Sequence, residues 1–511
     1  PPLLAYARAE GERRFAVSFA QEQMLVLHSM NPTSSQYNVP WCVRLDGDLD
    51  TGSLRRAFEL VVRRHEILRT SFQSVGETGQ YMQVVTPAAD AVLSMRVEDM
   101  ASLSQDAALT SAMSLVDEEA NRAFDLEAGP LMRVLLVHVG DMEHVLLVNT
   151  HHIATDEWSI NLLCGEIGTA YAAFVEGREP DMPALSVQYS DYARWQREWL
   201  GADGGSERLR QLSYWREQLA GAPLVLDLPT DYPRPAVQSH DGSTVSVSIP
   251  ADLVRLLRHK ATTAQASLFM VLLGAFELLL SRYAGVSDIV IGAPIAGRSR
   301  SETHQSMGYF VNTLALRVDL SNLSSIDDLL SRVRKACLDG YANADVPFQD
   351  VVDALKIERD PSYSPVFQTM FTLLDDGANS GSTLDSWGGV CLHDDAAVSW
   401  TTSKFDIDLT ILQDGDDLIA SFEYSTALFD GTTIEFMGRH FVALLHSMSA
   451  DTLGPVAALS LLDADELNLV TKAWNATTAS YPDGKCIHEF LIEQAEKTPD
   501  AIALCGNGRS M

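Results

Sequence analysis

The feature that most constrains the fold is a pair of apolar segments, residues 131–139 and 144–152, divided by a short polar turn at 140–143. Segments of this length around such a turn predict a β-hairpin. The second segment is apolar at every position over 145–148, so both faces of this strand need cover. Apolar side chains then recur at helical spacing over 160–174, which predicts a helix directly after the strand.

Strand and helix patterns alternate elsewhere too. An amphipathic pattern at 53–66 predicts a helix, and the following RTSF predicts the start of a strand. Later in the chain, the segment 243–249 predicts a strand, Ala251 begins an amphipathic helix, and 267–283 predicts a buried helix before a strand at 288–295. Alternation of this kind is typical of an α/β protein.

With 511 residues, the chain is too long for one compact core. The polar, proline-containing stretch at 176–183 predicts the crossing between two lobes. We therefore expect four parts, namely a linker, a first lobe, a second lobe, and a further linker with the start of another domain. Their predicted bounds are 1–14, 15–180, 181–465 and 466–511.

Charge and cysteine usage exclude several classes of protein. The net charge of −32 disfavours binding to nucleic acid and to anionic membranes. The six cysteines are scattered without a CxxC pair, which argues against a zinc site or a disulfide scaffold. The N-terminal segment lacks the apolar stretch of a signal peptide, and the apolar run at 268–280 is too short to cross a bilayer and contains Glu277. We expect a cytoplasmic location.

The sharpest local feature is the segment HHIATDEWS at 151–159, placed where the buried strand ends and the helix begins. Neighbouring residues of a strand point to opposite faces, so one histidine can face a cleft while the other packs inward. His151 and His152 therefore cannot readily share a metal ion. His144 is on the face of His152 but lies roughly 26 Å away, at ~3.3 Å per residue. We predict no metal site.

The residue types in this segment allow more than one role. Asp156 precedes a helix, where it could cap the free N–H groups of the first turn or pair with an arginine. A neutral imidazole with a pKa near ~6.5 could accept a proton from an amine or hold that amine by a hydrogen bond. A histidine at a strand end could equally be a satisfied core residue.

Seven segments occur in an order that resembles the condensation domains of nonribosomal peptide synthetases. HHIATDEWS is similar to the HHxxxDG signature of that family. The seven segments are SFAQEQMLVL (18–27), RHEILRTSF (64–72), HHIATDEWS (151–159), YSDYARWQ (189–196), IGAPIAGR (291–298), MGYFVNTLALR (307–317) and ADVPFQDVVDAL (344–355). The segment at 475–504 resembles the start of an adenylation domain.

The resemblance implies roles for individual residues. His152 would be the catalytic histidine, as a general base or as the group that positions the acceptor amine. Asp156 would be structural and paired with Arg298, and His151 would pack. Weaker candidates for the cleft are Asn312, Thr313, Ser399, Trp400 and Ser403.

The resemblance also implies a fold and an activity. Two lobes like chloramphenicol acetyltransferase would form a V-shaped pseudodimer, with a tunnel between them. The domain would be an acyltransferase that moves a donor acyl or peptidyl thioester from one carrier protein to the amine of an aminoacyl group on a second carrier. Both groups would be carried on 4′-phosphopantetheine, with no cofactor bound by the domain itself. We expect a monomer that adjoins an adenylation domain and serves secondary-metabolite biosynthesis, such as that of an antibiotic or siderophore.

The sequence departs from the family pattern at two positions. Glu157 replaces the glycine of the signature, and we expect it to narrow substrate access and to raise the basicity of His152. Asn343 replaces a common histidine, at a position that we expect to be structural. Two alternatives stay open, an epimerisation domain and a non-catalytic docking module. The aspartates of heterocyclisation domains are absent from the signature positions.

Overall fold

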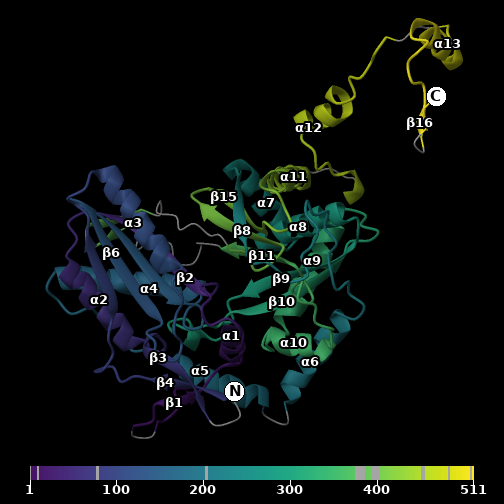
Figure 1. Cartoon of the computed structure of the whole chain (residues 1–511). Helices are drawn as coiled ribbons and strands as arrows, with labels where there is room; N and C mark the ends of the chain where they lie inside the picture. The colour runs from purple at the N-terminus through teal and green to yellow at the C-terminus, as the bar shows by residue number, and fades with distance from the viewer. Residues whose placement is uncertain are drawn as a thin grey trace. The chain divides into compact units, whose positions relative to one another are not determined.

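The computed structural model describes residues 2–8, 11–75, 80–201, 205–374, 386–393, 402–450, 455–480, 484–506 and 509–510. The chain forms two compact units, Pro1–Leu461 and Leu462–Met511. The first unit contains two lobes, each with a six-stranded sheet and packed helices, so the chain is an α/β protein as predicted (Figure 1).

The sheet of the first lobe has the strand order β12-β13-β2-β7-β6-β5. The predicted hairpin is confirmed, since β6 and β7 pair antiparallel with Leu135 opposite Leu147. The strands are β12 (Ser386–Trp387), β13 (Val390–His393), β2 (Asn38–Asp46), β7 (Glu143–His151), β6 (Met132–Gly140) and β5 (Ser94–Asp99). The helices that cover it are α2 (Thr51–Arg64), α3 (Gln105–Ala120) and α4 (Glu157–Val175).

Both faces of β7 are buried, as the apolar run at 145–148 predicts. Val145 and Leu147 pack in one core with α3, whereas Leu146 and Val148 pack in a second core with α2 and α4. The predicted helix at 53–66 begins earlier, at Thr51, because the Asp50 carboxylate accepts hydrogen bonds from the first-turn N–H groups of Gly52 and Ser53.

A smaller sheet, in the order β1-β4-β3, and two helices complete the first lobe. These elements are β1 (Arg14–Ala16), β4 (Gln80–Val85), β3 (Thr70–Val75), α1 (Phe19–Met30), the 3-10 helix at Glu66–Arg69 and α5 (Tyr189–Gly201). α1 begins with a capping box in which Ser18 and Gln21 satisfy each other's backbone N–H groups.

The sheet of the second lobe has the order β10-β9-β11-β14-β15-β8. Its strands are β10 (Asn312–Asp319), β9 (Asp288–Ile295), β11 (Thr369–Leu374), β14 (Ile407–Asp414), β15 (Asp417–Ser425) and β8 (Gly242–Ile249). Its helices are α6 (Ser206–Gln218), α7 (Ala251–Thr263), α8 (Leu268–Ala284), α9 (Ile326–Tyr341), α10 (Phe348–Leu355) and α11 (Gly431–Ser449), with 3-10 turns at Ser301–Thr303 and Val456–Ala458.

Side chains on β14 alternate between the two faces of this sheet. Ile407, Leu409 and Ile411 are fully buried in the core with the helices, whereas Asp408 and Thr410 are on the other face. α8 is the buried helix predicted from the apolar run. Among the described residues, no single helix is long and apolar enough to span a bilayer, and α7 and α8 pass such a test only as a pair bent by 103°.

A chain segment that is inserted between two strands of the second sheet belongs to the first sheet. β12 and β13 lie between β11 and β14 in the sequence, yet β13 pairs with β2 of the first lobe, with Leu392 opposite Leu45. Trp387 packs so closely on α4 that a side chain at Gly168 would meet its ring at 2.4 Å. Part of the predicted second lobe, 181–465, therefore completes the first sheet.

The second unit contains α12 (Ala464–Asn468), a π-helical turn (Leu469–Ala473), α13 (Ile487–Lys497) and the short strands β16 (Cys505–Gly506) and β17 (Arg509–Ser510).

Candidate active site

The two adjacent histidines at the end of β7 occupy different surroundings. His151 is 2% exposed and packs against the rings of His28, Tyr37 and Phe124. Its Nδ1 accepts a hydrogen bond from the N–H of Ile153 at 3.1 Å. Burial lowers the pKa of His151 to about 3, so this ring is neutral, and it packs among aromatic side chains.

His152 points the other way and lines a cavity. Its Nδ1 lies 2.7 Å from the carbonyl oxygen of Thr155. Because a carbonyl can only accept, Nδ1 carries the hydrogen, and the lone pair of the neutral ring is on Nε2. The ring of Tyr309 packs against the imidazole, with centroids 4.8 Å apart. Nε2 is thus left to accept a hydrogen bond or a proton.

The environment of His152 makes it less basic, not more. Burial is the largest cause and the nearby charge of Lys404 the second, and together they lower the pKa of His152 to about 4. Burial and Lys404 outweigh the opposing effect of the Asp156 carboxylate, and the effect expected of Glu157 on this basicity stays a prediction. Glu157 is an exposed first residue of α4 and does not line the cavity. Its role in substrate access stays a prediction, which the rate of Glu157→Gly would test.

Asp156 performs both of the roles that the sequence left open. Its Oδ1 accepts a hydrogen bond from the Ser159 N–H at 2.8 Å, which caps α4. The same oxygen lies 2.9 Å from Nη2 of Arg298, in an ion pair whose two side chains are each 1% exposed. Oδ2 accepts from the Phe310 N–H at 3.1 Å. This carboxylate therefore ties the loop of His152 to two segments of the second lobe.

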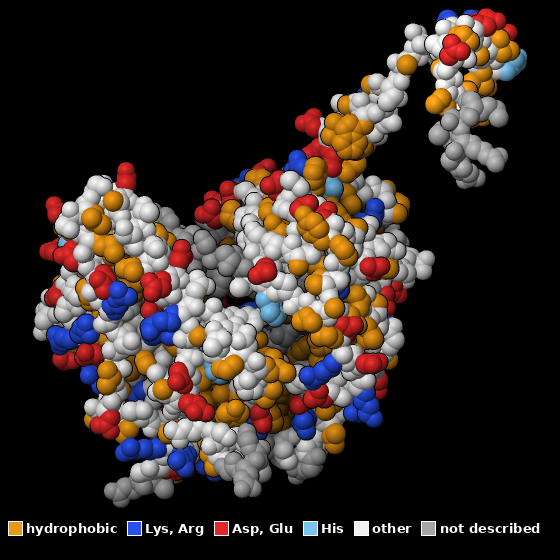
Figure 2. All heavy atoms as spheres, viewed as in Figure 1, with side chains coloured by type: hydrophobic (Ala, Val, Ile, Leu, Met, Phe, Trp, Pro, Cys, Tyr) orange, Lys and Arg blue, Asp and Glu red, His pale blue; other side chains and the backbone are white. Residues whose placement is uncertain are grey.

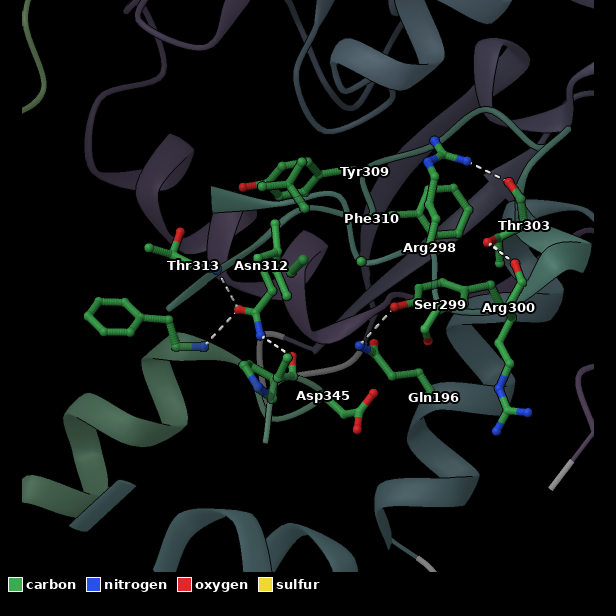
Figure 3. Close-up of a pocket in the computed structure, with 18 of the residues that line it drawn as sticks. Gln196, Arg298, Ser299, Arg300, Thr303, Tyr309, Phe310, Asn312, Thr313 and Asp345 are labelled. Carbon is green, nitrogen blue, oxygen red and sulfur yellow. Dashed lines mark hydrogen bonds between the residues drawn. The ribbon is translucent and has the colours of Figure 1, made fainter. Parts of the chain in front are cut away.

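Arg298 is held from its other side as well. Its Nη1 donates to the carbonyl oxygens of Thr303 and Ser306, at 2.6 and 2.7 Å, and Figure 3 shows the first of these bonds. Its guanidinium also lies over the ring of Phe310, 4.0 Å from the centroid. Arg298 therefore acts as a structural link and does not reach into the cavity of His152.

The cavity that His152 lines has a volume of about 800 Å³ and walls from both lobes. The first lobe contributes α1 and the residues around Tyr37, and the second contributes the face of its sheet that the helices leave uncovered. Figure 2 shows the molecule hollowed between the lobes, with hydrophobic side chains around the hollow. The sheet residues that line the cavity are Pro294, Thr313, Met370, Thr372 and Asp408.

Figure 3 shows a second cavity, which has a volume of about 300 Å³. It shares lining residues with the first cavity, including Gln23, Tyr309 and Thr313. Asn312 lines it, but its side chain is used by the protein. Its Nδ2 donates to the carbonyl oxygens of Ala344 and Val346, each at 2.8 Å. Asn312 therefore shapes a loop, whereas Thr313 faces both cavities.

The remaining candidates have less to do with the cavity. Ser403 is buried, and its Oγ donates to the Phe405 carbonyl oxygen at 2.7 Å. Ser399 and Trp400 lie outside the described residues. Asn343 is buried and structural, with its Oδ1 accepting from Arg210 at 3.0 Å.

A charged cluster beside the cavity was missed from the sequence. Lys404 and Asp408 both line the cavity, and Glu423 lies directly opposite Asp408 across β14 and β15. The pKa of Asp408 is raised to about 7, chiefly by burial and secondly by the charge of Glu423. Spacing in the sequence does not reveal this cluster, because Lys404 precedes β14 and Asp406, which lies between Lys404 and Asp408 in the sequence, pairs with Arg234.

Among the residues that the structure describes, no group of three or more His, Cys, Asp or Glu side chains is placed to hold a metal ion. The site consists of one imidazole, a buried ion pair behind it and a charged cluster across the cavity.

Comparison with known proteins matches residues 12–470 to a sequence family described as the condensation domain. Linear gramicidin synthase subunits C and D of Brevibacillus parabrevis are each 40% identical, over 96% and 98% of this chain. The chain covers only 6% and 10% of the length of these two relatives.

Solved structures resemble the chain in fold. The X-domain from teicoplanin biosynthesis is 26% identical, with a TM-score of 0.76 over 90% of this chain and 100% of that chain. A four-domain nonribosomal peptide synthetase bound to AMP and glycine has a TM-score of 0.82 and 22% identity, over 98% of this chain and 38% of that one.

Proposed function

The chain belongs to the condensation-domain family, and from this we propose that it forms peptide bonds between two acyl groups carried on separate carrier proteins. The observation that carries the proposal is the His152 ring. It lines a cavity walled by both lobes, and its one N–H is committed to the Thr155 carbonyl.

The proposed reaction uses a thioester as the activated donor. The amine nitrogen of the acceptor attacks the thioester carbonyl carbon, and the π electron pair of that carbonyl moves onto its oxygen. When the pair returns, the C–S bond breaks, an amide forms, and the thiolate takes the proton that the nitrogen loses. His152 Nε2 would hold or accept an amine proton during the attack.

Placement of both reactants supplies much of the rate in this proposal. A cavity between two lobes can receive a phosphopantetheine arm from each side, and well-oriented reactants can lower a barrier by ~7–11 kcal/mol. The buried pair Asp156–Arg298 supports such placement, because it fixes the loop that bears His152 against the second lobe.

The partners and neighbours are proposals as well. We propose that the donor and the acceptor are bound to an upstream and a downstream carrier protein. Residues 1–14 would be the linker from the upstream carrier, and 466–511 would be a linker with the start of an adenylation domain. The relatives support this arrangement, since this chain is a small part of each.

One observation favours the alternative of a non-catalytic docking module. The X-domain from teicoplanin biosynthesis is also solved in a complex with OxyB, and it is 25% identical to this chain in that structure. A fold of this kind can therefore bind a partner protein. We favour catalysis because His152 lines the cavity and, among the described residues, no protein group is hydrogen-bonded to its Nε2.

Reconstitution distinguishes peptide-bond formation from the two alternatives, epimerisation and non-catalytic docking. The chain is mixed with a donor-loaded and an acceptor-loaded carrier protein, and the carriers are analysed by intact-protein mass spectrometry. We expect a dipeptidyl group on the acceptor carrier, and none when either loaded carrier is omitted. An acyl group of inverted configuration, detected by chiral chromatography after its release from one carrier, would indicate epimerisation instead. A carrier complex without any product would indicate docking.

A further inference from the structure

Two of the described residues that line the cavity are a lysine and an arginine, Lys404 and Arg359, and burial lowers the pKa of Lys404 from its ordinary value. Arg359 forms an ion pair with Asp353 at 3.2 Å, and its side chain is 67% exposed, so its charge is screened by water. Lys404 is partly buried and precedes β14, whose open face forms a wall of the cavity. Lys404 is therefore the cation inside the cavity.

The ammonium group of Lys404 has hydrogen-bonding capacity to spare. Its Nζ lies 5.1 Å from the centroid of the Tyr37 ring, a cation–π contact between the lobes. An ammonium has three N–H donors, and within the described part of the chain none of those of Lys404 donates to a protein atom. A partly desolvated donor of this kind favours an oxygen ligand that enters the cavity.

The charges around Lys404 leave its positive charge available. The carboxylates near it are those of Asp408 and Glu423, and burial raises the pKa of both. Because the pKa of Asp408 is about 7, this carboxylate is protonated in a large fraction of molecules near neutral pH. Its Oδ1 is buried without a hydrogen-bond partner, and among the described residues no ion pair joins this carboxylate to the ammonium of Lys404.

Tyr37 connects Lys404 to the imidazole. Its carbonyl oxygen accepts a hydrogen bond from the backbone N–H of His152 at 2.8 Å, while its ring supports the ammonium. His152 and Lys404 are therefore both in contact with Tyr37, and both line the same cavity. The imidazole offers only a lone pair to this cavity, because Nδ1–H is used by Thr155. In the proposed reaction, the thioester carbonyl oxygen becomes negative, so a group other than this imidazole must donate a hydrogen bond to it.

We propose that Lys404 is a further catalytic residue, whose ammonium holds the carbonyl oxygen of the donor thioester and stabilises its negative charge. This inference rests on the proposed function. During the attack, the electron pair displaced from the C=O bond collects on that oxygen, beside the ammonium, and it returns when the C–S bond breaks. Lys404 keeps its protons throughout, so its contribution is electrostatic and greatest when the tetrahedral adduct has formed.

Steady-state kinetics of Lys404→Met test this role. We expect kcat to fall about 100-fold, as on removal of one donor to such an oxygen, while KM for the acceptor-loaded carrier changes less than about twofold. Lys404→Arg should recover part of the loss, because it keeps the charge in a different geometry. The matched control is Lys335→Met on α9, whose side chain is 78% exposed, with unchanged kcat and KM.

A binding measurement covers the case in which Lys404→Met folds poorly. A pantetheine-linked phosphonate imitates the anionic tetrahedral adduct, and its Kd is measured by calorimetry on folded Lys404→Gln and native protein. We expect weaker binding by about the factor lost in kcat/KM. Equal Kd values, or a raised KM with unchanged kcat, would overturn the inference. If the native protein makes product and Lys404→Met does so equally fast, only this inference fails. If the native protein makes none, the proposed function fails.

Discussion

At the scale of single residues, the site depends on the tautomer of one imidazole. The Thr155 carbonyl holds the hydrogen on Nδ1 of His152, and burial with the charge of Lys404 keeps the ring neutral. A protonated ring could not accept a proton from an amine. The lowered pKa therefore preserves the form of His152 that the proposed reaction needs, the neutral ring, to well below neutral pH.

The protonation state of His152 can be measured directly. We expect ¹³C-histidine NMR to show a midpoint for His152 at about pH 4, with the ring still neutral at pH 5.5. The spectrum of His152→Gln identifies the signal by its loss. A midpoint near the ordinary value of ~6.5 would show that burial and Lys404 do not act on this ring.

The same shift has a consequence for stability. The lowered pKa means that the unfolded chain binds more protons than the folded one between about pH 6.5 and 4. The free energy of unfolding therefore rises with pH in this window. The contribution of His152 to stability is lost as the pH falls from about 6.5 to 4. His151 contributes in the same direction, since its pKa is about 3.

At the scale of elements, α4 is fixed by what lies before and beside it. Asp156 caps its first turn and binds Arg298, and Gly168 leaves room for the ring of Trp387 from β12. α4, the helix that follows the histidines, is thus held by contacts with both lobes. This arrangement keeps His152 at the wall of the cavity.

Loss of the Asp156 carboxylate should be costly. Asp156→Ala leaves Arg298 buried without its counter-charge, so we expect the free energy of unfolding in urea to fall by about 3–5 kcal/mol. The control is Asp339→Ala, which breaks the exposed pair with Lys335 and should cost less than about 1 kcal/mol. Equal losses in the two variants would contradict the structural role of Asp156.

The sequence predicts the elements that bury periodic apolar faces. The hairpin at 131–152 and the buried helix after Ser267 follow from side-chain periodicity, and the family resemblance predicts the pairing of Asp156 with Arg298. β12 and β13 could not be predicted, because strands of two and four residues are too short for a periodic pattern. Lys404 was missed because its importance comes from a contact across the lobes, with Tyr37, that spacing in the sequence does not encode.

At the scale of the whole molecule, the cavity exists only because two lobes share elements and contacts. The first sheet is completed by β13 from the second lobe, and a buried ion pair joins the lobes behind His152. The imidazole comes from one lobe and the ammonium of Lys404 from the other. Neither lobe alone contains the site.

The most direct test of this account is the single-turnover rate of amide formation by His152→Ala, with donor and acceptor carriers loaded in advance. Removal of the ring should lower the rate by about 10²–10⁴-fold while the midpoint of thermal unfolding stays close to that of the native protein. His259→Ala, which removes an exposed histidine of α7, should react at the native rate. Amide formation by His152→Ala as fast as by the native protein would contradict the central role of this imidazole.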